Sequence, residues 1–346
     1  MGAWADARLR LFRDAREAAG RTVDDRARRR ARPPHPGPRG PAGKAPLPRP
    51  ASAPAAGPVR RGRDVSASEV AHEWTLAPAV LVGAGIALAL FAQAFWRLRH
   101  RGGGERAPWT RAAIFTAAIA AAVLALVSPL DTAGEKFLLS AHMLQHVVIG
   151  DLVPALALVA LRGPLVFFLL PAPVLGRLAR LAPLRRALGF VLRPRMSLAA
   201  WAVVIAVWHI PRVYDSVLTR PVVHDLEHVS FLVVGLLVWC QLVDPARRRA
   251  LSTARRIGYA VVLFAFGLAL ADVLVFSFHP LYGAYAEQPD RLWEISPLTD
   301  QRLAGVVMMV EQLLTLGTCI ALILVGRQRA AARVHELSPE RAVVSP

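Results

Sequence analysis

The chain has 346 residues, of which 55% are hydrophobic, and a formal net charge of +18. Its apolar residues fall in blocks of about 20, the length that crosses a bilayer, and such blocks are too long for a soluble core. The composition therefore excludes a soluble globular protein. It predicts an all-α, polytopic membrane protein, because backbone polar groups in lipid must bond within their own segment.

The positive charge does not indicate a nucleic-acid-binding protein, because of where it lies. Arginines are concentrated in the N-terminal tail and in alternate loops between the apolar blocks. This distribution is typical of a membrane protein whose cytoplasmic loops are basic. We therefore expect the lipid bilayer, and no nucleic acid, as a partner.

The N-terminal tail, residues 1–75, is rich in arginine up to Arg32 and in proline from Pro33 to Pro58. It contains no apolar run that could serve as a signal peptide, and its composition predicts disorder. One interpretation is that translation begins later, at Val65 or Val70. The alternatives are a tail that crosses the membrane, or a span too many or too few.

Seven transmembrane helices are predicted in residues 76–327, followed by a cytoplasmic C-terminal tail at 328–346. The spans are expected at about 76–96, 109–129, 137–160, 197–217, 222–243, 257–276 and 301–326.

The topology follows from the loops at 97–107, 161–196 and 244–256, which are basic, whereas the loops between them are poor in arginine. By the positive-inside rule, the basic loops and the C-terminus are cytoplasmic and the N-terminus is outside. Transfer of the basic N-terminal tail across the membrane is unfavourable. We still predict that the N-terminus is outside, because the first, third and fifth loops are all basic and indicate the same orientation.

The third span contains His142 and His146, which share one helix face because they are four residues apart. This spacing is typical of metal chelation. Asp151 and Met143 point elsewhere, since each residue turns the helix by about 100°. We therefore predict a packing role for Asp151 and expect Met143 to miss the site.

A basic segment and a single further histidine follow the third span. Between Pro173 and Leu192, arginines alternate with leucines, which predicts a basic amphipathic helix on the cytoplasmic membrane surface. The fourth span ends at His209, where Pro211 can kink or stop the helix. Its direction places His209 near the outer face.

The last three spans add further donors at the same depth. His224 and His228 open the fifth span, and an acid and two adjacent methionines follow in the outer halves of the sixth and seventh. The candidate metal ligands are therefore His142, His146, His209, His224, His228, Met308 and Asp272. Cys240 and Cys319 fall toward the inner half without C-x-x-C spacing, so we predict that they are packing residues.

A single histidine in a membrane helix is as readily a hydrogen-bonded core residue as a ligand, but two repeated pairs favour a metal site. Imidazole suits copper and zinc, and thioether sulfur favours Cu(I). The donor set is therefore compatible with copper, as Cu(I), and with zinc as the alternative.

The same stretches carry a resemblance to a known family. Ser140–His146, Trp208–Pro211 with Tyr214-Asp215, and His224–His228 resemble the signature stretches of the CtaG family of cytochrome c oxidase assembly factors. Asp300-Gln301 with Gly305 and Met308 resembles the family's last span. The similarity covers about residues 76–326 and departs at Pro154-Ala155, where a double proline is expected.

The resemblance implies a multi-pass protein of the bacterial plasma membrane that is needed to make active haem-copper oxidase. It implies copper handling for the metal centres of that enzyme. The expected partners are then haem-copper oxidase subunits and a copper donor on the extracytoplasmic side. In this interpretation the protein is not an enzyme.

Two other classes of protein would use similar residues. A zinc-dependent membrane hydrolase would take three histidines, a water molecule and a nearby acid, with Glu227 or Asp272 as candidates. A bis-histidine haem protein would take its axial ligands from facing helices.

Overall fold

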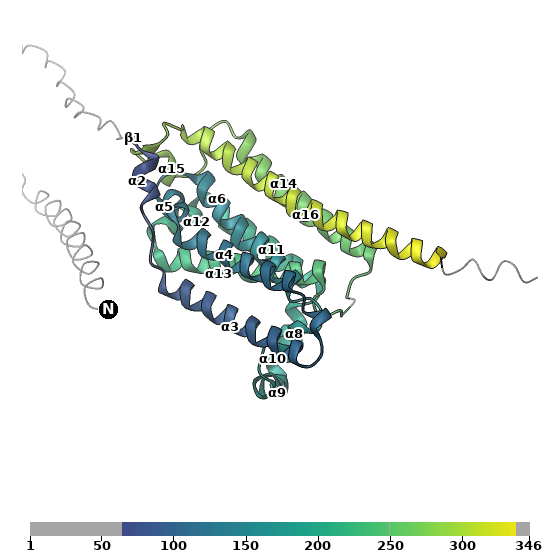
Figure 1. The fold of residues 1–346 in the computed structure, drawn as a ribbon. Coiled ribbons are helices and arrows are strands. Elements are labelled where there is room, and N and C mark those ends of the chain that lie inside the picture. Colours follow the sequence, from purple (N-terminus) through teal and green to yellow (C-terminus); the bar gives the residue numbers. More distant parts are fainter. Residues whose placement is uncertain (1–63, 249, 337–346) are drawn as a thin grey trace, which may run out of the picture. The chain divides into compact units, whose positions relative to one another are not determined.

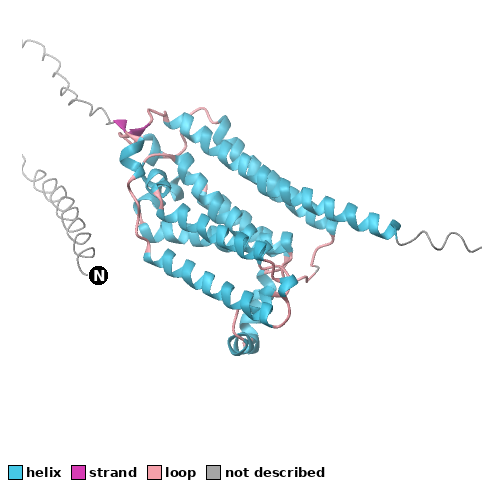
Figure 2. Cartoon of the chain, in the orientation of Figure 1, coloured by secondary structure: helices cyan, strands magenta, loops and turns pink. Residues whose placement is uncertain are grey.

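The computed structural model describes residues 64–248 and 250–336, and this part of the chain is an α-helical bundle (Figures 1 and 2). Besides helices and loops, the described residues form one short parallel pair of strands, β1 (Asp64–Val65) and β2 (Arg291–Leu292). The all-α, polytopic fold predicted from the sequence is therefore confirmed.

Six helical segments of the described chain are long and apolar enough to cross a membrane. They are α3 (Pro78–His100), α4 (Trp109–Val127, preceded by the turn η1 at Gly104–Arg106), the continuous segment Leu139–Ala160, α13 (Pro221–Val243), α14 (Thr253–Phe276) and α16 (Pro297–Glu336). A seventh span is obtained if α10 (Ala182–Val191) and α11 (Pro194–Trp208), which meet at an angle of 74°, are counted together.

The fourth predicted span is shorter than expected. A helix over 197–217 was predicted, but α11 ends at Trp208 and a separate helix, α12, begins at Pro211 and extends to Thr219. Pro211 ends the span because it lacks an N–H and its ring would clash with the carbonyl of Val207. His209 thus lies at the break between two helices.

The basic segment after the third span also differs from the prediction of one amphipathic helix. After the short helix α8 (Leu165–Phe168), it forms α9 (Ala172–Arg180) and then α10. The break falls at Leu181, since a continuous helix would bring Pro183 against the carbonyl of Ala179.

The basic loops meet at one end of the bundle. The N–H of Gly163 donates to the carbonyl of Pro245 over 2.8 Å, and the guanidinium of Arg111 donates to the carbonyl of Arg162. The other end holds α5 (Pro129–Lys136), α12 and α15 (Gly283–Ala286) (Figure 1). The bundle therefore separates basic loops from acidic ones, although which end faces outward remains a prediction.

The segment just before the first span is structured. Residues 64–75 were predicted to belong to the disordered tail, but α2 (Ala67–Ala71) forms there, with Ser66 and Glu69 in a capping box. Val70 packs with Leu138 and Leu292 in a small apolar cluster, which explains why this segment is fixed. The rest of the predicted tail, residues 1–63, lies outside the described residues.

The third span is not a regular helix. It consists of α6 (Leu139–Val147), a π-helical turn η2 (Val148–Leu152) and α7 (Val153–Ala160). Pro154 has no N–H for the carbonyl of Gly150, four residues earlier, and π turns of this kind arise where the normal ladder is interrupted. The freed carbonyl faces Gly235 of α13, where an added Cβ would lie only 1.9 Å from the Gly150 oxygen.

This contact predicts that Gly235→Ala destabilises the bundle by at least about 1–3 kcal/mol, because backbone has to move to admit the methyl group. Gly258→Ala is the matched control, since nothing lies within 4 Å of an added Cβ there. The control is expected to be neutral or stabilising by up to about 1 kcal/mol, as alanine is the better helix former. Thermal unfolding in detergent compares the two, and equal stabilities would contradict the close approach.

The charge distribution gives a second prediction, on orientation. A reporter that is active only outside the cell should work when fused after Leu218 or Gln288 and fail after Gly103 or Ala250. The reverse pattern would place the histidine pairs on the cytoplasmic side and contradict the predicted topology.

Candidate metal centre

Four side chains from two spans meet inside the bundle. His142 of α6 and three residues of α13, His224, Glu227 and His228, offer donor atoms that all lie within 4.8 Å of one another. Their side chains are nearly inaccessible, with exposures of 0% to 8%. We call these four residues the metal centre.

The position of His142 is set by a cap from a distant helix. α6 has no side-chain cap of its own, and Asp300 of α16 supplies one. Its carboxylate accepts hydrogen bonds from the N–H groups of Leu139 and Ser140, at 2.6 and 3.1 Å, and from the Ser140 hydroxyl at 2.5 Å. A carboxylate is favoured at this place by the helix dipole as well. The first turn of α6, and with it His142, is therefore fixed against α16.

The three donors of α13 share one face because of their spacing. His224 and Glu227 are three residues apart, and His224 and His228 are four apart, so all three project from one side of the helix. The imidazole rings of His224 and His228 have centroids 4.1 Å apart. Glu227 directs one oxygen to 4.0 Å from Nε2 of His142.

Two tyrosines determine which nitrogen of His142 can bind a metal. The hydroxyl groups of Tyr214 and Tyr285 both lie 2.9 Å from Nδ1. Tyr285 gives its single hydroxyl proton to the carbonyl of Gly134, so toward His142 its oxygen can only accept. Tyr214 in turn donates its proton to the oxygen of Tyr285. With both tyrosine oxygens as acceptors, Nδ1 carries the proton, and the lone pair of Nε2 faces the metal centre. Burial raises the pKa of Tyr285 well above its ordinary value, which keeps the phenol neutral.

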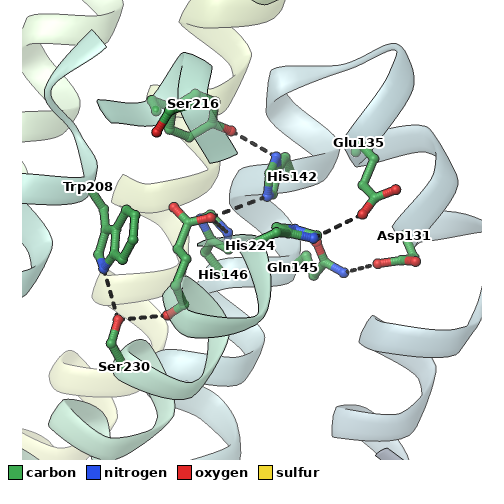
Figure 3. A network of polar contacts seen from close by, with 12 residues as sticks. Asp131, Glu135, His142, Gln145, His146, Trp208, Ser216, His224 and Ser230 are labelled. Atoms are coloured by element: carbon green, nitrogen blue, oxygen red, sulfur yellow. Dashed lines mark hydrogen bonds and ion pairs between the residues drawn. The ribbon is translucent and has the colours of Figure 1, made fainter. Parts of the chain in front are cut away.

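An acid holds the corresponding nitrogen, Nδ1, of His224. Glu135 of α5 lies 2.9 Å from Nδ1 of His224, which leaves Nε2 for the centre (Figure 3). Histidines that ligate metals generally make such a contact with their other nitrogen. Glu135 is 41% exposed, so it connects the buried centre with the end of the bundle that holds α5.

The centre contains several polar atoms with no hydrogen-bond partner among the described residues. They are Nε2 of His142, His224 and His228, and both carboxylate oxygens of Glu227. A buried polar atom without a partner costs about 1–3 kcal/mol. A cation bound between three imidazole nitrogens and a carboxylate would satisfy these atoms, so the donor set fits a metal ion.

The other predicted ligands lie at different distances from the centre. His146 lies beside it, with Nε2 3.4 Å from the Glu227 carboxylate, and neither ring nitrogen makes a hydrogen bond within the described residues. His209 binds the carbonyl of Ile205 through Nδ1 at 2.8 Å, and its buried Nε2 has no partner in the described chain. His209 and Met308 line a cavity next to His146.

Asp272 is not brought to the centre. The neighbouring Ala271 and Leu274 face Gly305 of α16, where α14 and α16 pack closely. A residue next to Ala271 on a helix is turned by about 100° from that contact. The sequence argument gave the depth of Asp272 but not its direction.

Further polar contacts hold the walls of the centre. The Gln145 amide donates to Asp131 at 2.7 Å and to the carbonyl of Ala125 at 2.8 Å, which ties α6 to α4 and α5 (Figure 3). Burial raises the pKa of Asp131, although the hydrogen bond from Gln145 opposes this effect. The indole of Trp208 donates to Ser230 at 2.8 Å and so joins the end of α11 to α13.

The family model for the cytochrome c oxidase caa3 assembly factor matches residues 89–330, more than half of the chain. The chain belongs to this family. Comparisons with curated proteins and with solved structures give no significant match. The match confirms the resemblance inferred from the histidine motifs, and it includes every residue of the metal centre.

The sequence analysis missed the groups that complete the centre. Glu227 was considered only as the acid of a hydrolase, although its three-residue distance from His224 already placed both on one face. The contacts of Tyr285 and Glu135 join segments far apart in the chain, so no local spacing indicates them.

The role of Tyr285 generates a testable prediction. Tyr285→Phe removes one of the two hydroxyl groups that hold Nδ1 of His142, and we expect metal affinity to fall about 10- to 100-fold, as is usual for such supporting contacts. Tyr259→Phe is the matched control, because that buried hydroxyl bonds Ser197 at 2.9 Å and lies away from the centre. Competition with a chelator measures both. Equal affinities would show that the tyrosine does not orient the ligand.

Proposed function

We propose that this assembly factor binds copper at the metal centre and passes it to subunits of a haem-copper oxidase. The proposal is supported above all by the three inward-facing Nε2 atoms of His142, His224 and His228, buried without partners beside Glu227. Imidazole donors suit copper and zinc. Membership of an oxidase assembly family favours copper, because copper is a component of the enzyme being assembled.

The exposure of Glu135 supports the proposal that copper enters the centre and is then passed on. Glu135 is partly exposed and contacts His224 directly, so a cation can meet a carboxylate before it reaches buried nitrogen. In the predicted topology this entrance faces the extracytoplasmic side of the bacterial plasma membrane, with the N-terminus outside and the C-terminus in the cytoplasm. Copper would then come from a donor on that side, with Cu(I) as the expected state.

A zinc-dependent hydrolase is the main alternative, and Glu227 is the observation that favours it. Three histidines and an adjacent acid could hold zinc and activate water. A hydrolase also requires its substrate to reach the metal, whereas the four side chains of the centre are 0% to 8% exposed. This burial favours a site that exchanges small ions over one that admits a lipid.

A haem protein is less compatible with the space inside the bundle. The cavity beside His146 and His209 has a volume of about 70 Å³, whereas pockets for cofactor-sized ligands measure about 300–1,000 Å³. A porphyrin between these histidines would require the spans to separate.

The copper proposal predicts the behaviour of histidine variants. His142→Ala and His228→Ala should each lower copper affinity by at least about tenfold, and the double variant should add little, because ligands of one ion act as a unit. Oxidase activity of the membranes should fall in parallel. Copper per purified chain and oxidase activity, both normalised to inserted protein, provide the measurement.

His279→Ala and Cys240→Ser are the controls, since His279 lies in an exposed loop and Cys240 packs in a different apolar cluster. Both should keep full copper content. Full copper in the two histidine variants would contradict the proposal. Tighter binding of zinc than of copper, together with turnover of a lipid amide, would support the hydrolase instead.

A further inference from the structure

A cavity of about 70 Å³ lies inside the bundle, beside the metal centre but lined by other residues. His146 faces both, because it contacts Glu227 of the centre and also lines the cavity. The remaining walls include two thioethers, a second histidine and two acids: Met143, Met308, His209, Asp151 and Glu311. No role in the metal centre accounts for this combination.

The cavity is lined by polar atoms that lack partners within the described chain. They are both ring nitrogens of His146, Nε2 of His209, and one side-chain oxygen each of Glu311 and Gln312. The walls are otherwise mostly apolar, with Trp201, Ile205 and Phe231 among them. Buried polar atoms without partners are costly, and a polar or charged occupant of the cavity would satisfy them.

The sulfur atoms narrow the choice of occupant. Met143 and Met308 are 1% and 5% exposed, and they bring thioether sulfur to the cavity from α6 and α16. Thioether and imidazole together are donors for Cu(I), whereas hard cations such as Mg²⁺ prefer oxygen.

The acids provide a charge for a cation to balance. Asp151 and Glu311 share a hydrogen bond, which requires a proton on one of them. Asp151 also accepts from the Trp239 indole and from the Thr315 hydroxyl, so it has the partners of a carboxylate and Glu311 is the donor. Neither acid pairs with a lysine or arginine in the described residues. One negative charge thus lies inside the membrane domain, where an unbalanced charge is costly.

We propose that this cavity is a second copper site, in which Met143, Met308, His146 and His209 hold Cu(I) and the Asp151–Glu311 pair balances its charge. The inference rests on the proposed copper function of the metal centre. His146 would take part in transfer between the two, since it lies at the boundary of both. Copper would then occupy a nitrogen-rich position first and a sulfur-containing position deeper in the bundle.

Titration of the purified full chain with Cu(I), without oxygen and against a chelator, tests the inference. We expect two copper ions per chain and sulfur scattering in the X-ray absorption spectrum. The double variant Met143→Leu, Met308→Leu should bind one ion, without sulfur scattering. Met309→Leu is the matched control, because this neighbouring methionine packs against the same apolar cluster as Met143 and Met308 but does not line the cavity. It should keep two ions and the sulfur signal.

Two further variants separate this site from the metal centre. The double variant His224→Asn, His228→Asn should lose the nitrogen-bound ion and keep the sulfur-bound one. Asp151→Asn retains the shape of the side chain and removes the negative charge of the pair, and it should weaken the sulfur-bound ion by at least about tenfold. Thermal unfolding of each variant checks that it is folded.

The outcomes are distinct. One nitrogen-bound copper in the wild type, unaffected by the methionine variant, would overturn the second site and leave the metal centre intact. Sulfur scattering that persists in the folded methionine double variant would also overturn it. No copper in the wild type at all would overturn the proposed function, and the second site with it.

Discussion

A carboxylate with no exposed surface is the constraint on which the arrangement of the bundle depends. Glu227 lies between His142 and His146, and its oxygens have no hydrogen-bond donor among the described residues. Taking a carboxylate out of water costs several kcal/mol unless charge of the opposite sign compensates it. A cation shared between this carboxylate and the surrounding imidazoles would provide this compensation.

The rest of the structure holds α6 and α13 at the separation that this carboxylate requires. Gly235 allows α13 to approach the π turn, and Asp300 fixes the first turn of α6 from the opposite side. Tyr285 and Glu135 then fix the imidazole rings from the loops. Each contact joins segments that are distant in the sequence, so the geometry of the centre is a property of the complete bundle.

Hydropathy and helical periodicity were sufficient for much of this picture. Apolar blocks identified the spans, and His-x-x-x-His spacing identified the two helix faces that meet. These patterns could not predict where a side chain points when tertiary packing determines its direction. Asp272 was expected at the depth of the histidines, but it is not among the donors that the structure groups together, and its neighbour Ala271 faces α16. Met143, expected to miss the site, is absent from the metal centre but lines the cavity beside it.

Backbone irregularities were the second feature that the sequence patterns could not predict. A uniform period of 3.6 residues gives the correct faces in α13, but it cannot predict the π turn that follows His146, which shifts the register of Asp151. The hydrogen bonds that Asp151 accepts from Trp239 and Thr315 agree with the packing role predicted for it. The capping box that orders residues 66–69 was present in the sequence, but the composition of the preceding tail concealed it.

Under the proposed function, the contact between Glu135 and His224 would affect the kinetics of loading. His224 is 9% exposed on its side chain, whereas Glu135 is 41% exposed, so an arriving ion would meet the carboxylate first. Such an ion would exchange its ligands one at a time, first for the carboxylate and then for the imidazole. The rate of filling would therefore depend on how readily the donor gives up its own ligands, and a tightly chelated ion would load slowly even where equilibrium favours the protein.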